Sequence, residues 1–299
     1  MTTSTPLALV EDAPAKVNLF LHLRGLRADG YHLIESLVVF PQIGDVLWAE
    51  PSDRVSLSVS GPFGDGLSTD VDNLVLRAAA ALAAGWPGRG AVLRLAKNLP
   101  VASGIGGGSS DAAAALRLLS RLWGCSPPPG LAPSLGADVP VCIAAPQPQI
   151  MTGIGEQVTP APPLPPCWIV LANPREPVET RAVFAATPQK KPPPAPLLPG
   201  TGFSSFGAFA EWLRTQRNDL AEAAEGLCPP IGAVLASLSG APVARMSGSG
   251  ATCFALHASA AAAAQQAASL RRAQPGWWVA DAEVTTAPTF RPDRQPRPL

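Results

Sequence analysis

The stretch from residue 99 to residue 116, LPVASGIGGGSSDAAAAL, decides the fold of this chain. Four glycines, at positions 104, 106, 107 and 108, precede Ser109-Ser110-Asp111 and an alanine run typical of a helix. Glycine lets a backbone turn sharply and approach a ligand closely, because it has no Cβ. Serine or aspartate can cap the helix, whose first turn offers unpaired N–H groups at the positive end of its dipole. The stretch therefore predicts a loop that binds phosphate groups, with a plain turn before a helix as the alternative interpretation.

Two widespread phosphate-binding patterns do not match this glycine loop. The Walker pattern requires a lysine followed by Ser or Thr after its last glycine, and Gly108 is followed by Ser109-Ser110. The dinucleotide pattern G-x-G-x-x-G requires a third glycine where Ser109 stands, which disfavours a Rossmann-type oxidoreductase. We therefore expect a different nucleotide-phosphate loop, one that ends in serines.

The composition indicates a globular protein with room for two domains of ordinary size. The 299 residues are 47% hydrophobic and 15% charged. Because 22 basic residues balance 22 acidic ones, we expect neither a nucleic-acid surface nor a membrane anchor. The five cysteines show no C-x-x-C spacing, which disfavours a zinc site or a disulfide framework. The N-terminus has no secretory pattern, so a cytoplasmic location is expected, whereas the oligomeric state stays open.

Alternating and helical patterns divide the first half of the chain into strands and helices. Strands are expected over 15–23, 33–40 and 91–95, a strand and hairpin over 45–59, and helices from Asp72 or Asn73 to 84 and from the glycine loop to 123. Lys16 and Asn18 lie on one face of the first strand, either at a solvated edge or in a site. Tyr31 and His32 follow the Ala28-Asp29-Gly30 turn, where they either pack the next strand or bind a ligand.

The segment 135–143, LGADVPVCI, places Asp138 before a short apolar run that we expect to be a strand. An acidic side chain at the mouth of a buried strand is costly unless it is paired or functional. Asp138 is therefore a turn or cap residue, a catalytic base, or a partner of Lys16.

The second half of the chain follows the proline-rich segment 160–166, a candidate linker between domains 1–160 and 167–299. Segment 244–257, ARMSGSGATCFALH, predicts two strands around a Ser-Gly turn, which either forms an ordinary hairpin or approaches the active cleft. Further elements are a short helix within 178–184, strands over 168–172 and 277–285, and helices over 203–215, 218–226, 231–238 and 258–272. We expect an exposed loop over 189–199 and a frayed tail from residue 288.

Five segments in order resemble the motifs of the GHMP kinases: AKVNLFLHLRGLRADGYHLIES, LPVASGIGGGSSDAAAAL, LGADVPV, GIGE and MSGSGATCFA. The resemblance implies an α+β fold with a ribosomal-S5-like N-terminal domain and a ferredoxin-like C-terminal domain. It implies that ATP, carried with Mg²⁺, phosphorylates the 2-hydroxyl of a cytidine diphosphate-linked polyol of the non-mevalonate isoprenoid pathway. The alternatives are a homoserine or mevalonate type of GHMP kinase, or a nucleotide-binding regulator without catalysis.

The resemblance also implies residue roles. Asp138 would be the base that accepts the hydroxyl proton, and Lys16 would polarise that hydroxyl. Substrate would be bound by Asn18, His32 and Thr180, with the cytosine ring between Tyr31 and Phe184. Either Ser109 or Ser110 would help to place Mg²⁺, and no dedicated protein metal site is expected. The nucleotide would be bound by Asn73 and Lys97 around adenine and, along the loop, by Pro100, Val101, Ala102, Ser103, Gly104, Ile105, Gly106, Gly107, Gly108, Ser109 and Ser110.

Two positions depart from the family pattern. Ala102-Ser103 stands where a further glycine is usual, which reduces backbone freedom at the start of the loop. Asp111 stands where asparagine is common. A carboxylate near phosphates is unfavourable, so we expect Asp111 to face away from them or to cap the helix.

Overall fold

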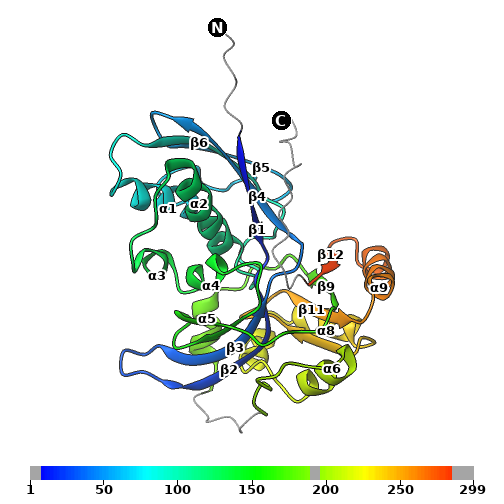
Figure 1. The fold of residues 1–299 in the computed structure, drawn as a ribbon. Coiled ribbons are helices and arrows are strands. Elements are labelled where there is room, and N and C mark those ends of the chain that lie inside the picture. Colours follow the sequence, from blue (N-terminus) through cyan, green and yellow to red (C-terminus); the bar gives the residue numbers. More distant parts are fainter. Residues whose placement is uncertain (1–7, 189–195, 285–299) are drawn as a thin grey trace.

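Three four-stranded sheets and the helices around them make up the part of the chain described by the computed structural model, residues 8–188 and 196–284 (Figure 1). The first sheet has the order β1-β4-β6-β5, with β1 Leu9–Pro14, β4 Gly44–Ser52, β6 Gly90–Ala96 and β5 Ser56–Ser60. The second has the order β2-β3-β7-β8, with β2 Val17–Leu26, β3 His32–Val39, β7 Gln149–Thr152 and β8 Gln157–Pro160. The third has the order β10-β11-β9-β12, with β10 Val243–Met246, β11 Cys253–His257, β9 Trp168–Asn173 and β12 Trp278–Glu283. This mixture confirms the predicted α+β class.

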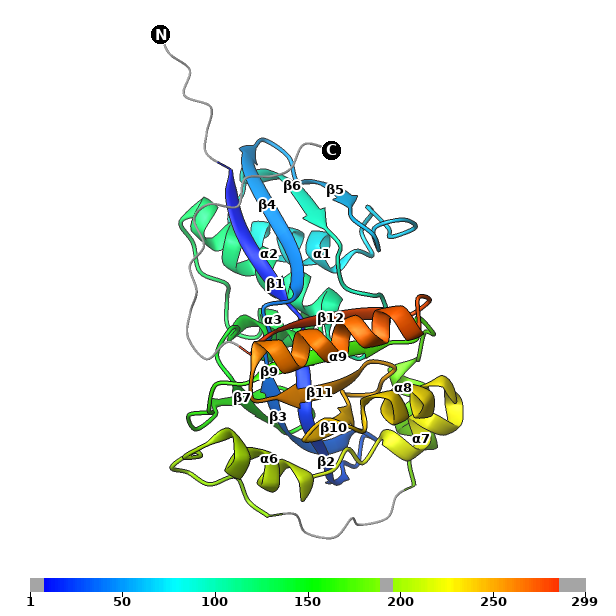
Figure 2. The ribbon, with the colours of Figure 1, turned by 90° about the vertical axis from the view of Figure 1, so that its right-hand side faces the viewer.

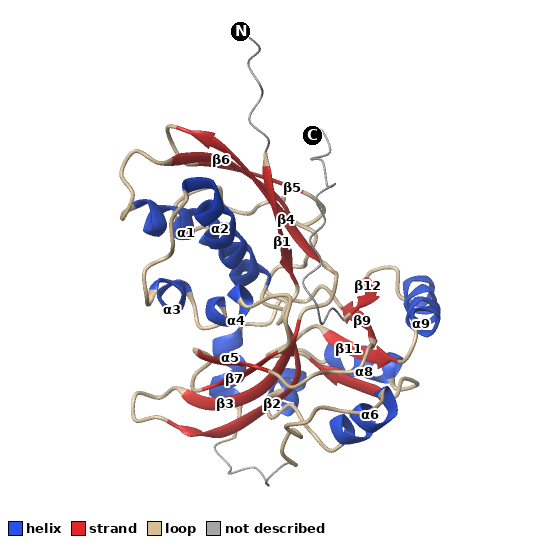
Figure 3. Ribbon diagram, viewed as in Figure 1, coloured by secondary structure: helices blue, strands red, loops and turns tan. Residues whose placement is uncertain are grey.

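Helices α1 (Leu74–Ala83) and α2 (Gly107–Trp123) cover one face of the first sheet (Figure 3). Four successive alanines of α2, residues 112–115, are fully buried. Their small side chains let the helix pack closely on the sheet and on α1, which fixes the start of α2 against the core. Asn73 caps α1 by accepting a hydrogen bond from the amide of Val75 at 2.9 Å, as predicted.

The third sheet carries α9 (Ala260–Ala273) on one face, as Figure 2 shows. The remaining helices are α3 Leu131–Leu135, α4 Val139–Ile143, α5 Thr180–Ala186, α6 Phe206–Arg214, α7 Ala221–Leu227 and α8 Pro230–Leu238. One hydrophobic core takes Leu19 and Leu37 from the second sheet together with Ile169 and Phe254 from the third. The two sheets therefore pack as one body across the predicted linker, and the division at 160–167 stays a prediction.

Three local predictions are wrong. The segment 45–59 does not form a hairpin, because β4 and β5 lie on opposite edges of β6, antiparallel and parallel to it respectively. Residues 139–143 form the short helix α4 rather than a strand, with Pro140 in its first turn, where proline is well tolerated. The predicted serine or aspartate cap of α2 does not form, because the helix begins at Gly107, directly after the left-handed Gly106, and no side chain caps it.

Parts of two other predictions fall outside the described residues. The predicted loop 189–199 is described only from residue 196, and the predicted frayed tail from residue 288 lies beyond residue 284. Among the described helices, none is long and apolar enough to cross a membrane.

Candidate active site

The carbonyl groups of the glycine loop are hydrogen-bonded to other parts of the chain. The carbonyl oxygens of residues 102–106 all accept hydrogen bonds, from the amides of Val178, Thr252, Lys16 and Ser110 and from the hydroxyl of Ser247. In a trans peptide the carbonyl and the following N–H point in opposite directions. The N–H groups of residues 103–107 are therefore turned away from these partners and, with the open first turn of α2, form a cradle suited to an anion.

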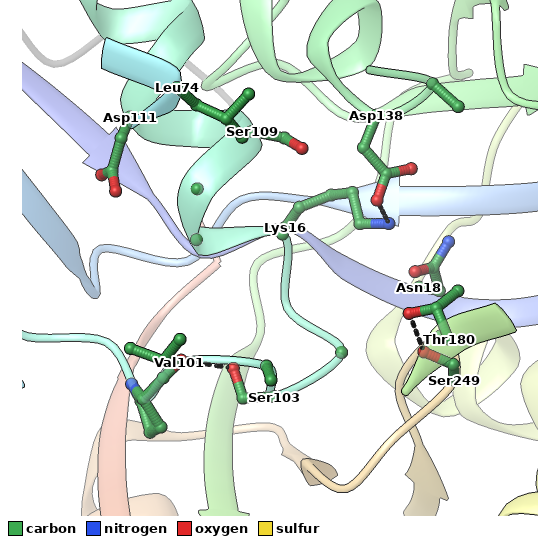
Figure 4. Close-up of a pocket in the computed structure, with 18 of the residues that line it drawn as sticks. Lys16, Asn18, Leu74, Val101, Ser103, Ser109, Asp111, Asp138, Thr180 and Ser249 are labelled. Atoms are coloured by element: carbon green, nitrogen blue, oxygen red, sulfur yellow. Dashed lines mark hydrogen bonds and ion pairs between the residues drawn. The ribbon is translucent and has the colours of Figure 1, made fainter. Parts of the chain in front are cut away.

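Lys16 and Asp138 meet beside this cradle. The Nζ of Lys16 donates to Oδ2 of Asp138 at 2.8 Å, although the two residues are 122 positions apart (Figure 4). The amide of Lys16 also donates to the carbonyl of Ile105 at 2.8 Å, which fastens the start of β2 to the loop. A Cβ on Gly106 would lie 3.1 Å from the Cβ of Lys16, so glycine leaves room for the lysine stem. The Lys16 side chain is 5% exposed and that of Asp138 is 34% exposed, so the carboxylate can reach a bound molecule.

A cavity of about 590 Å³ joins the cradle and the ion pair. Its polar lining includes Lys16, Asn18, Asp138 and Ser109, and the last of these points into the cavity from the first turn of α2 (Figure 4). The apolar lining comes from Leu21, Ile34, Met151, Ile154, Phe184 and Leu220 at one end and from Leu67, Leu74, Leu95, Pro100 and Val101 at the other. The volume suits a small molecule together with a nucleotide.

The two serines after the glycines have different surroundings. Ser109 lines the cavity, whereas the Ser110 hydroxyl is buried and donates to the carbonyl of Pro14 at 2.7 Å. Ile105 is also buried outside the cavity. The other predicted loop residues, Pro100, Val101, Ala102, Ser103, Gly104, Gly106, Gly107 and Gly108, all line the cavity.

The predicted substrate residues are only partly brought together. Asn18 and Thr180 line the cavity with Phe184, and Asn18 Oδ1 is buried with no partner among the described residues. The ring of His32 lies 5.4 Å from that of Phe184, so the pair that forms is His32–Phe184. Tyr31 is 60% exposed and does not line the cavity, so its stacking on a cytosine ring stays a prediction.

Asn73 and Lys97, predicted around adenine, lie at the Leu67–Val101 end of the cavity. Asn73 holds this end together, since its side chain both caps α1 and donates to the carbonyl of Ser68 at 2.7 Å. The Lys97 ammonium is buried between the carboxyl groups of Asp45 and Asp111. Asp111 thus lies on the far side of the cavity from the Lys16–Asp138 pair (Figure 4), and its orientation relative to bound phosphates stays a prediction.

Burial changes the pKa values of this ion-pair cluster. Burial raises the pKa of Asp111 to about 8, with Lys97 acting against the rise and Asp45 adding to it. For Lys97, burial lowers the pKa, but the two neighbouring carboxyl groups outweigh it and raise the pKa overall. Lys97 therefore keeps its charge at neutral pH, and Asp111 gains or loses its proton slightly above it.

The Ser-Gly turn between β10 and β11 approaches the cleft. Of the two interpretations that the sequence left open, an ordinary hairpin or a turn at the cleft, the structure supports the second. Ser247 donates to the carbonyl of Gly104 at 3.2 Å and accepts from the amide of Asn18 at 3.1 Å. Ser249 lines the cavity, and its hydroxyl lies 2.9 Å from that of Thr180. The sequence signal was the Ser-Gly-Ser-Gly pattern, but its contacts with residues far away in the chain were not predictable.

Comparison with known proteins gives the class of this site. Residues 73–144 match the family model of the GHMP kinases N terminal domain, and residues 201–276 match that of the GHMP kinases C terminal. Both matches fit the observed α+β fold and define the class as a GHMP kinase. ATP is accordingly the phosphate donor that the class uses.

Relatives give the particular family. The 4-diphosphocytidyl-2-C-methyl-D-erythritol kinase of Ruegeria pomeroyi is 52% identical over 284 residues, covering 93% of this chain and 100% of the relative. The kinase of the same name from Cereibacter sphaeroides strain ATCC 17029 is 50% identical over 278 residues, covering 91% and 98%. A crystal structure of 4-(cytidine 5'-diphospho)-2C-methyl-D-erythritol kinase matches with a TM-score of 0.75 at 33% identity, covering 93% and 100%. The chain belongs to the 4-diphosphocytidyl-2-C-methyl-D-erythritol kinase family.

A more distant structural match shows the fold alone. A homoserine kinase from Cytophaga hutchinsonii has a TM-score of 0.65 at 18% identity, covering 95% of this chain and 96% of that chain. It confirms that the same fold extends over most of this chain and adds nothing on the acceptor.

Proposed function

We propose that this protein transfers the γ-phosphate of ATP to the 2-hydroxyl of 4-diphosphocytidyl-2-C-methyl-D-erythritol. The observation that carries the proposal is the Lys16–Asp138 ion pair, which lies in one cavity with a loop whose carbonyl groups at residues 102–106 are all occupied by hydrogen bonds within the protein. Relatives about 50% identical over nearly the whole chain carry the name of this kinase, which supports the choice of acceptor. The homoserine and mevalonate types have no such support.

In this proposal Asp138 accepts the proton of the attacking hydroxyl. The hydroxyl oxygen forms a bond to the γ-phosphorus, the bond to the bridging oxygen of ADP breaks, and the proton passes to the carboxylate. Lys16, 2.8 Å from Asp138, donates to the same hydroxyl oxygen and thereby orients it. The N–H groups of residues 103–107 lie where negative charge increases on the transferring group, and they need no rearrangement to stabilise it.

The substrate's cytidyl end is assigned to the cavity end with Phe184. The aromatic face of Phe184, backed by His32 at 5.4 Å, offers a flat surface for the cytosine ring. The unpartnered Oδ1 of Asn18 and the hydroxyl of Thr180 supply polar contacts in the same region. Adenine is assigned to the opposite end, near Leu67, Asn73 and Val101.

Magnesium is expected to arrive with ATP. Oxygen ligands suit Mg²⁺, which keeps several waters, and the Ser109 hydroxyl and the Asp138 carboxylate both line the cavity. The described residues contain no group of three or more His, Cys, Asp or Glu side chains able to hold a metal by themselves. The residues present thus fit an ion shared with phosphate oxygens, which would neutralise part of the triphosphate charge.

The five cysteines are all free thiols, which agrees with a reducing compartment such as the cytoplasm, where ATP is abundant. We therefore keep the cytoplasmic location, and a small-molecule partner without nucleic acid or membrane, as part of the proposal.

Incubation with Mg-ATP and the cytidyl substrate, followed by phosphorus NMR, tests the proposed function. We expect a new phosphomonoester signal that increases as ADP accumulates. Parallel incubations with homoserine and mevalonate should give no such signal. Phosphate transfer to either of these, and none to the cytidyl compound, would contradict the proposal.

A further inference from the structure

Both ends of the phosphate loop are tied to one buried ammonium group. Nζ of Lys97 donates to Oδ2 of Asp111, in the second turn of α2, at 2.6 Å and also bonds Asp45. The other oxygen of Asp45 accepts from the amides of Asn98 and Leu99, at 2.5 and 2.8 Å, where the chain enters the loop. The side chains of Lys97, Asp45 and Asp111 are at most 5% exposed. Their contacts thus fix the distance between the loop's entry and its exit.

The ammonium also lies directly beneath the start of α2. A Cβ on Gly107 would lie 3.0 Å from Nζ of Lys97, so the helix begins in close contact with the cluster. Lys97 and Asp111 both line the cavity. Oδ1 of Asp111 is buried and has no partner among the described residues.

We propose that Asp111, held by Lys97 and Asp45, is a positioning residue that sets the geometry of the phosphate loop for tight nucleotide binding. The inference rests on the proposed function only in that the loop binds a nucleotide triphosphate. The Lys97 ammonium joins Asp111 on α2 to Asp45, which in turn holds the amides of Asn98 and Leu99. Loss of the Asp111 carboxyl group therefore frees the start of α2 from the loop's entry.

The test measures binding of Mg²⁺-β,γ-imido-ATP by calorimetry for wild type, Asp111→Asn and Asp111→Ala. Asp111→Ala removes the contact with Lys97, so its Kd should be about tenfold higher than that of wild type. Asp111→Asn keeps an oxygen that can accept from Lys97, so its Kd should stay within about threefold of wild type. Asp53→Asn, the same change at an exposed carboxylate, should bind the analogue as wild type does.

Two results would overturn the proposal. One is an Asp111→Ala protein that unfolds cooperatively on heating, as wild type does, and binds with the wild-type Kd. The other is an Asp111→Asn protein that has the wild-type Tm and a Kd about tenfold higher, which decides the matter even where the alanine variant does not fold. Because the analogue binds without the acceptor, failure of the proposed kinase activity shows separately, as a wild-type protein that binds the analogue yet phosphorylates no cytidyl substrate.

Discussion

Replacing Gly104 by alanine tests how closely the two glycine-containing loops approach each other. Gly104 has φ of +74°, and a Cβ built there would lie 2.8 Å from the backbone N and C of Gly250, with the carbonyl oxygen of Gly250 closer still. The left-handed conformation costs alanine about 1–2 kcal/mol, and the overlap with a rigid backbone adds about 1–3 kcal/mol. The free energy of unfolding should therefore fall by about 2–5 kcal/mol, which corresponds to a Tm about 3–8 °C lower for a chain of this length.

The same change should also weaken nucleotide binding. Gly104 accepts from Ser247 at 3.2 Å, so pushing the two loops apart moves the anion cradle itself. Gly88→Ala is the matched control, because Gly88 has φ of +79° and no atom lies within 4 Å of the position that an alanine methyl would take there. Differential scanning fluorimetry and calorimetry with an ATP analogue measure both effects. The reasoning is refuted if Gly104→Ala loses no more stability than Gly88→Ala and binds the analogue as wild type does.

Three other predictions concern parts of the fold around the cleft. Arg245→Met removes the donor to the carbonyls of Leu19 on β2 and Gln216 after α6, so urea unfolding should show a loss of about 3 kcal/mol, against little change for the exposed Arg271→Met. Burial, helped by nearby arginines, lowers the pKa of His22 from 6.5 to about 4, so the unfolded chain binds a proton first as the pH falls. Stability should thus decrease between pH 6.5 and 4 by at most about 1.4 kcal/mol per pH unit, and His22→Phe should remove this slope in urea titrations; an unchanged slope would exclude His22 as its source. Phe184→Ala should raise KM for the cytidyl substrate more than KM for ATP in steady-state assays, and equal changes would contradict the assigned base site.

Local signals predicted much of the fold. The alanine run of α2 and the cap of α1 are encoded by neighbouring residues, and of the two predicted caps it is Asn73 that forms. The strand predicted over 15–23 also forms, shifted to Val17–Leu26. The five-residue run 139–143 was too short to distinguish a strand from a helix, and tertiary packing decided for α4. The 45–59 hairpin failed because β5 pairs with β6, which is more than thirty residues further along the chain.

The candidate site was predictable in its residue types rather than in its contacts. Lys16 and Asp138 were singled out separately, and only the folded chain shows their 2.8 Å contact across 122 positions. Composition gave no reason to connect Lys97 with Asp45 and Asp111, because buried ion pairs have no local sequence pattern. Tyr31 was suggested as a binding residue by its place after a turn, but its side chain is mostly exposed in the structure. Position in the sequence alone therefore did not predict its surroundings.

The role of the Lys16–Asp138 pair is tested most directly by the rate of phosphate transfer in Asp138→Asn, measured by rapid quench at saturating Mg-ATP and cytidyl substrate. Asparagine keeps the shape of the side chain and can still accept from Lys16, but it is not a base for the hydroxyl proton. The account predicts a rate lower by about 10²–10⁴-fold with the Kd for the ATP analogue within about threefold of wild type. A near-normal rate in this variant would contradict the assignment of Asp138 as the proton acceptor.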